Sequence, residues 1–125
     1  MTRTLRLAGA QMGPNQKADS REAILARMIA LLEQAAAAGA KMVVFPELPL
    51  TTFYPRWLFT DQAELDSYFE REMPNPRVQP LFDRARALGI GFYLGYAELT
   101  PYGKRYNTAI TVGPDGSVLG KYRKI

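Results

Sequence analysis

The feature that constrains the fold most is a short, uninterrupted apolar run, Met-Val-Val-Phe, at residues 42–45. Gly39 and Pro46 bound this run, and its lack of polar alternation predicts a strand that is buried on both faces. An apolar segment at residues 4–12 predicts an earlier strand, and residues 20–38 between the two predict a helix. A strand, a helix and a second strand in this order predict a right-handed crossover and a parallel pair of strands.

The predicted helix carries signals at both of its ends. Asp19 is the expected N-cap, because Glu22 follows at the spacing of a capping box, and Gly39 is the expected stop. Apolar residues recur at helical spacing on one face, namely Ile24, Met28, Leu31, Leu32 and Ala35. We therefore expect this helix to cover one face of the sheet.

The rest of the chain is predicted to contain an aromatic loop, two helices and three strands, at residues 48–61, 62–71, 78–88, 90–99, 106–112 and 117–125. The last two strands form a hairpin around the turn Gly113-Pro-Asp-Gly116. The predicted order is β-α-β-α-α-β-β-β, which indicates an α/β fold. We expect the strands through Leu5, Met42 to Phe45 and Ile90 to Leu94 to lie side by side in one sheet.

Composition removes several kinds of chemistry from this chain. Its 125 residues include no cysteine and no histidine, which excludes histidine bases, Cys/His zinc sites, disulfides and thiol nucleophiles within it. We expect no metal and no cofactor. There is no secretory signal pattern and no apolar run approaching the roughly 18 residues of a membrane span, so a cytoplasmic protein without membrane contact is predicted.

The net charge of +4 is confined to the last part of the sequence. Residues 1–102 carry 11 Lys or Arg and 11 Asp or Glu, whereas residues 103–125 carry five basic residues against Asp115 alone. One interpretation is a surface that binds nucleic acid or another polyanion. The other is that the acidic complement lies in sequence beyond Ile125.

Glu47 is a candidate functional carboxylate because it comes directly after the apolar run. That position is the C-terminal edge of a parallel sheet, where α/β proteins usually bind their ligands. Partial burial there is expected to raise its pKa toward the range of a general base. The alternative is that Glu47 ends the strand and caps a neighbouring backbone group.

Lys124 is the second candidate. The alternation of a strand places Tyr122 and Lys124 on one face and Lys121 and Arg123 on the other. If the Tyr122 face is buried, the Lys124 ammonium needs a partner, and Glu47 is the obvious one. The alternative is a solvated, basic strand end.

Two segments carry a family resemblance. Residues 41–48, Lys-Met-Val-Val-Phe-Pro-Glu-Leu, and residues 120–125, Gly-Lys-Tyr-Arg-Lys-Ile, resemble the first two of three signature blocks of the nitrilase, or carbon-nitrogen hydrolase, superfamily. Within the superfamily, residues 45–57, 59–61 and 89–99 are similar to N-carbamoyl-D-amino acid amidohydrolases. The likeness covers essentially the whole chain.

This resemblance implies a Glu-Lys-Cys mechanism. Glu47 matches the general base and Lys124 matches the lysine that stabilises the oxyanion, while the family's nucleophilic cysteine lies in a later segment that this chain does not contain. We therefore expect the 125-residue chain to be inactive alone. The resemblance also implies that residues 1–125 form the N-terminal part of one domain, half of a four-layer αββα sandwich. Such a half would expose apolar surface.

The implied reaction is hydrolysis of N-carbamoyl-D-amino acids to D-amino acid, ammonia and carbon dioxide. The resemblance implies a small-molecule substrate, no nucleic-acid partner and a homo-oligomer, dimer or tetramer, in the full-length protein. Tyr54 is a candidate substrate contact near Glu47, although an aromatic side chain in such a loop is as often involved in packing or in an oligomer contact.

Alternatives to this reaction remain open. β-Ureidopropionase, aliphatic amidase and nitrilase activities share Glu47 and Lys124. Two further hypotheses are a non-catalytic module that binds a polyanion and a structural subunit that ends at Ile125. The catalytic reading requires Glu47 and Lys124 to lie within roughly 8 Å of each other, allowing for side-chain mobility.

Overall fold

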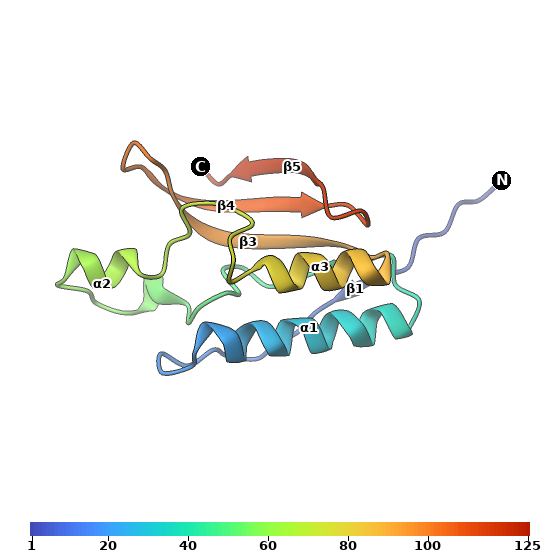
Figure 1. The fold of residues 1–125 in the computed structure, drawn as a ribbon, viewed down its shortest axis with the longest axis horizontal. Helices are drawn as coiled ribbons and strands as arrows, with labels where there is room; N and C mark the ends of the chain where they lie inside the picture. Colours follow the sequence, from blue (N-terminus) through green and yellow to red (C-terminus); the bar gives the residue numbers. More distant parts are fainter.

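A computed structural model describes residues 1–125 as a mixed five-stranded sheet with the two longer helices on one side and a short helix beyond the end of the strands (Figure 1). The strands lie side by side in chain order, β1 Leu7–Gly9, β2 Met42–Val44, β3 Gly91–Leu99, β4 Arg105–Val112 and β5 Val118–Arg123. The helices are α1 Arg21–Ala37, α2 Gln62–Asp66 and α3 Gln79–Leu88, with a 3-10 turn at Tyr54–Arg56. No helix combines the length and the apolar character needed to cross a bilayer.

The predicted element order and strand neighbours are confirmed. β1, β2 and β3 are parallel, and β3, β4 and β5 are antiparallel. β1 is shorter than the apolar segment that predicted it and does not include Leu5. β5 forms one edge of the sheet, and the chain ends beside it (Figure 1).

The start of α1 differs from the prediction. Ser20, not Asp19, is the N-cap, and its hydroxyl accepts a hydrogen bond of 3.1 Å from the backbone N–H of Ala23. The Asp19 carboxylate instead accepts one from the N–H of Gln16 and closes the preceding turn. Both side chains can cap a helix, so local sequence alone did not distinguish them. The buried residues of the helix are Ile24, Leu25, Met28, Leu32 and Ala35, with Leu25 in place of the predicted Leu31.

α2 is shorter than the helix predicted at residues 62–71. Asp61 caps its start, but the chain leaves the helix at Ser67 and runs beside β3. There Glu70 N–H donates to the Ala97 carbonyl, and Leu99 N–H donates to the Glu70 carbonyl. Pairing with the sheet therefore replaces the last helical turns.

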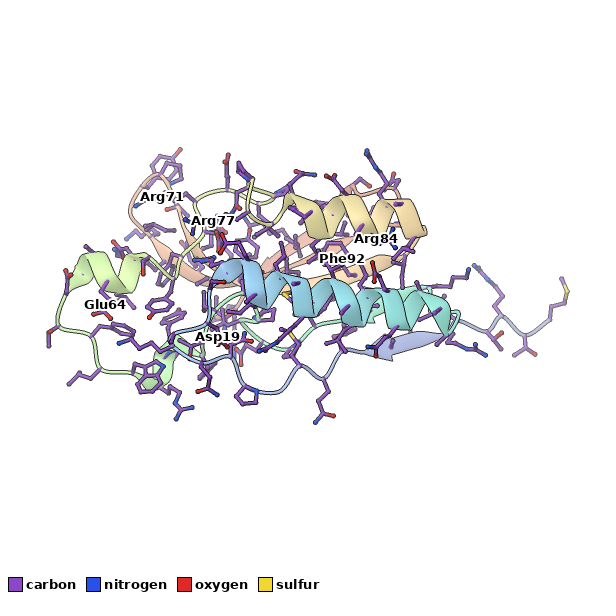
Figure 2. The ribbon with its side chains drawn as sticks, turned by 60° about the horizontal axis from the view of Figure 1, so that its bottom comes forward. Asp19, Glu64, Arg71, Arg77, Arg84 and Phe92 are labelled. Carbon is purple, nitrogen blue, oxygen red and sulfur yellow. The ribbon has the colours of Figure 1, made fainter.

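The core lies between the sheet and the pair of helices α1 and α3. Phe92 of β3 is fully buried there and packs edge-on against Phe82 of α3 and Phe45. Figure 2 shows Phe92 between α1 and α3. It also shows Arg84 of α3, whose guanidinium donates a hydrogen bond to Glu33 of α1 at the surface. These contacts fix the helices to one face of the sheet.

The second face of the sheet is open, so the prediction that the strand at residues 42–45 is buried on both faces is wrong. Val43 and Phe45 point toward the helices and are buried, but Val44 is 42% exposed. No element of the chain covers the face that carries Val44, Tyr93 and Tyr122, all of which are exposed. The fold is consistent with part of an αββα sandwich.

We expect Phe92→Ala to lower the free energy of unfolding by about 3–5 kcal/mol, because it leaves a cavity where three aromatic rings meet. Chemical denaturation monitored by circular dichroism measures this loss. Tyr102→Ala is the matched control, since Tyr102 is 89% exposed and its loss should change stability by less than about 0.5 kcal/mol. Equal losses in the two variants would contradict the assigned core.

Candidate functional site

Glu47 lies at the C-terminal end of β2, where the chain turns sharply. The next residue, Leu48, is buried and has a left-handed backbone with φ of 49°, a conformation that is uncommon for a bulky side chain. The turn passes closely over Gly95 of β3: a Cβ atom there would lie 3.4 Å from the backbone nitrogen of Leu48. Gly95 therefore lies directly beneath the turn that carries Glu47, on the open face of the sheet.

Lys124 follows β5 and meets Glu47 on that face. Its Nζ donates a 3.0 Å hydrogen bond to Glu47 Oε1, although 77 positions separate the two residues. The backbone N–H of Lys124 donates to the carbonyl of Asn107 at 2.8 Å, which continues the β4–β5 ladder past the end of the strand. The predicted convergence of the two side chains is thus found in the structure.

Asn107 of β4 is a third member of this site, and the sequence analysis missed it. Its side-chain amide donates a 2.6 Å hydrogen bond to Glu47 Oε1. Strand alternation could have placed Asn107 on one face with Ala109 and Thr111, but only the register against β3 shows that this face carries Glu47. Because Lys124 and Asn107 both bind Oε1, Oε2 accepts no hydrogen bond from the chain.

These contacts lower the pKa of the Glu47 carboxyl group, whereas the sequence predicted a raised pKa. The hydrogen bond from Lys124, and then that from Asn107, lower the pKa of Glu47 below its ordinary value, and the opposing effect of burial is smaller. The prediction of a raised pKa is wrong because the side chain is 49% exposed and so loses little hydration. Glu47 is therefore ionised at neutral pH.

Glu47, Asn107 and Lys124 border an open cavity of about 440 Å³. Its other lining residues are Tyr93, Gly95, Thr108, Ala109 and Tyr122. This volume is within the range of small-molecule sites, and the carboxylate, amide and ammonium groups that lie together in its wall provide orienting contacts. No group of three or more His, Cys, Asp or Glu side chains is arranged to hold a metal ion.

Tyr54 lies in an aromatic cluster beside the site. Its ring is 5.9 Å from that of Tyr68 and 5.2 Å from that of Phe69, and it does not line the cavity. Burial, and then the nearby negative charge of Glu47, raise the pKa of Tyr54. A direct contact of Tyr54 with substrate stays a prediction.

The basic residues of the last segment are mostly paired within the chain. Arg105 binds Asp66, Lys121 and Arg123 bind Glu98, and Lys124 binds Glu47. Contacts to carboxylates therefore account for four of the five positive charges that suggested a polyanion-binding surface.

The sequence profile of the carbon-nitrogen hydrolase family matches residues 6–125, a segment that contains Glu47, Asn107 and Lys124. The chain belongs to the carbon-nitrogen hydrolase family. This confirms the superfamily resemblance, whereas the finer likeness to N-carbamoyl-D-amino acid amidohydrolases is not shown.

Curated relatives of this carbon-nitrogen hydrolase chain include omega-amidases and cyanide hydratases. Omega-amidase NIT2 of Danio rerio is 36% identical over 121 residues, which cover 96% of this chain and 39% of that protein. Cyanide hydratase of Aspergillus niger is 31% identical over 106 residues, which cover 79% of this chain and 29% of that protein. The chain therefore spans about two-fifths or less of the length of these relatives.

Solved structures support the fold. An N-terminal amidase bound to a Gln-Val peptide has a TM-score of 0.76 at 22% identity, covering 96% of this chain and 28% of that one. An amidase from Nesterenkonia sp. has a TM-score of 0.74 at 21% identity, covering 97% of this chain and 43% of that one. At these identities the likeness shows a shared nitrilase-like fold.

We expect Lys124→Met to raise the pKa of Glu47, because it removes the hydrogen bond that lowers that pKa most. An NMR titration of the Glu47 carboxyl carbon measures the change. Lys41→Met is the control, since Lys41 is an exposed cation just before the opposite end of β2. Equal shifts in the two variants would show a general charge effect and would contradict a specific pair.

The lowered pKa of Glu47 makes the stability of the folded chain depend on pH. Because the pKa of Glu47 is lower in the folded chain than in the unfolded chain, the ion pair contributes to stability above the unfolded pKa. The contribution is lost as pH falls through the folded pKa. The difference in stability between the original protein and Lys124→Met should therefore shrink on acidification, as denaturation at a series of pH values would show.

Proposed function

We propose that this chain supplies the base and the oxyanion-binding cation of an amidase. The proposal rests on the arrangement around Glu47: Lys124 and Asn107 both donate hydrogen bonds to Oε1, while Oε2 has no hydrogen-bond partner in the chain. A carboxylate held by one oxygen has a fixed direction, and its other oxygen is available to accept a proton. The family supports hydrolysis of a carbon-nitrogen bond as the reaction.

The nucleophile must come from outside these residues, since the chain contains no cysteine. In the proposed step, a thiol supplied by another segment transfers its proton to Glu47 Oε2, and its sulfur attacks the carbonyl carbon of the substrate. Lys124 stabilises the negative charge that develops on the carbonyl oxygen. The carbon-nitrogen bond then breaks, Glu47 returns the proton to the leaving nitrogen, and water hydrolyses the thioester.

The lowered pKa of Glu47 has two opposite effects on this step. It keeps the carboxylate ionised, as a base must be at neutral pH, but it also makes Glu47 a weaker proton acceptor. The ammonium of Lys124 offsets the second effect, because a nearby cation lowers the pKa of a thiol and favours the thiolate. The same side chain thus acts on both partners of the proton transfer.

For the substrate, we propose N-carbamoyl-D-amino acids. Support comes from the similarity of residues 45–57, 59–61 and 89–99 to the amidohydrolases that act on these compounds. A second candidate class is the ω-amides, which the 36% identity to omega-amidase NIT2 of Danio rerio favours. Both classes contain an amide-type carbon-nitrogen bond that the proposed mechanism can cleave.

We expect Glu47→Gln and Lys124→Met, each made in the complete protein that contains this chain, to lower kcat by about 10²-fold or more. Steady-state kinetics measures this loss, and thermal unfolding shows whether folding is retained. The double variant should lose far less than the product of the two single effects, because the residues act on one step. Lys104→Met is the control, since Lys104 makes no ion pair, and near-normal activity is expected. Full activity in Glu47→Gln would exclude Glu47 as the base.

A substrate panel tests the finer proposal separately. We expect kcat/KM of the complete protein to be highest for N-carbamoyl-D-amino acids, compared with their L-isomers, ω-amides, aliphatic amides and nitriles. A preference for ω-amides would favour the second candidate, and a preference for nitriles would contradict both. None of these outcomes would alter the roles of Glu47 and Lys124.

A further inference from the structure

A second, buried carboxylate lies on the opposite face of the sheet from Glu47. Glu98 of β3 is only 5% exposed. Its carboxylate accepts a 2.8 Å contact from Lys121 Nζ and a 2.9 Å hydrogen bond from Arg123 Nε, both from β5. The hydroxyl of Thr108, on the intervening strand β4, donates to it at 3.2 Å. One carboxylate on β3 therefore holds two cations on β5 across β4.

β5 has few other means of fixing its position. It is the edge strand of the sheet, every one of its residues is exposed, and it pairs with β4 alone. β5 and β1 form the two opposite edges of the sheet, and Figure 1 shows β5 at the edge away from α1 and α3. Its side-chain anchors are Glu98 on one face and Glu47 on the other, with the Arg123 guanidinium also 4.5 Å from the Tyr106 ring centre.

We propose that Glu98 is a positioning residue for the amidase site: by binding Lys121 and Arg123, it fixes β5 so that the Lys124 ammonium meets Glu47. The inference rests on the proposed function of that site. Arg123 and Lys124 are adjacent and point to opposite faces, so the twist and register that satisfy Glu98 also set the direction of Lys124.

The ion pairs of Glu98 with Lys121 and Arg123 are stable because all three groups are charged at neutral pH. Burial is the largest single effect and raises the pKa of Glu98, but the hydrogen bonds and positive charges of Arg123 and Lys121 together lower it overall. Glu98 is therefore ionised at neutral pH and needs its cations. A buried carboxylate that loses its partners is strongly destabilised, whereas a half-exposed pair such as Glu47 with Lys124 is weak. Lys121 and Arg123 are 43% and 45% exposed, but the carboxylate that they share is buried. This buried carboxylate thus positions the exposed pair.

Glu70 provides a matched control. It is also buried, at 6% exposed, and it binds Arg21 and Asn75 through its carboxylate. Its backbone forms a bridge with that of Glu98, so the two residues lie side by side. The Glu70 carboxylate forms no hydrogen bond or ion pair with β5, so Glu70→Gln removes an equivalent buried charge without releasing that strand.

The test compares Glu98→Gln with Glu70→Gln in the complete protein, using NMR titration of the Glu47 carboxyl carbon. We expect Glu98→Gln to raise the pKa of Glu47, because Lys124 is no longer held on it. The direct electrostatic effect of deleting a negative charge has the opposite sign, so a rise reports displacement of Lys124. Glu70→Gln should leave the pKa of Glu47 unchanged or slightly lower.

Kinetics gives an independent readout. Glu98→Gln should lower kcat by about 10-fold to 100-fold through misplacement of Lys124, with a much smaller change in KM. The acidic limb of the pH dependence of kcat/KM should move to higher pH together with the pKa of Glu47. A purely structural loss would reduce the amount of folded protein without moving that limb, and Glu70→Gln is expected to behave in this way.

Glu98→Asp keeps the charge while shortening the side chain, and it serves if Glu98→Gln does not fold. It should raise the pKa of Glu47 in the same direction, and because the net charge is unchanged the shift would be geometric in origin. An unchanged pKa of Glu47 in a folded Glu98 variant would overturn the proposal. If the complete protein hydrolyses no amide, the proposed function fails, but the titration still decides whether Glu98 positions Lys124.

Discussion

The register of the three antiparallel strands β3, β4 and β5 is the constraint on which the site depends. It places Asn107 of β4 beside Glu47, and it brings the end of β5 across the same face. The ion pair between Glu47 and Lys124 does not create this arrangement, because both side chains are about half exposed or more and such pairs contribute only about 0–1 kcal/mol. The sheet brings Glu47 and Lys124 together. The position of the edge strand β5 is in turn fixed by its backbone hydrogen bonds to β4 and by the contacts of Lys121 and Arg123 with Glu98.

Opposite faces of the sheet have different electrostatic roles. On the helix side, Glu98 is buried and saturated by Lys121, Arg123 and Thr108, so its charge is used for structure. On the open side, Glu47 is half exposed and one of its oxygens is unpartnered, so its charge is available for chemistry. Side chains of a strand alternate between the two faces, so β5 and the residue after it join the two roles: Lys121 and Arg123 bind Glu98, and Lys124 binds Glu47.

The sequence predicted those features that depend on periodicity and on order along the chain. The apolar run at residues 42–45 predicted the second strand, and alternation at residues 121–124 predicted correctly which cations share a face. Features that depend on competition between near-equal local choices were not predictable. Ser20 and Asp19 are both good caps, and the last turns of α2 were lost to pairing of Glu70 with β3. Asn107 and Gly95 required knowledge of the register before they could be assigned to the site.

The direction of the Glu47 pKa was predicted wrongly for a reason that bears on catalysis. The sequence argument assumed burial, but the face that carries Glu47 is open, and hydrogen bonding from Lys124 and Asn107 dominates. A layer packed on this face would remove water from both charged groups, which raises the desolvation penalty of the carboxylate and strengthens its attraction to the ammonium at the same time. Desolvation makes the carboxylate more basic, and attraction makes it less so. The basicity of Glu47 in a closed site is therefore determined by how firmly Lys124 is held, which gives the anchoring of β5 a direct influence on the chemical step.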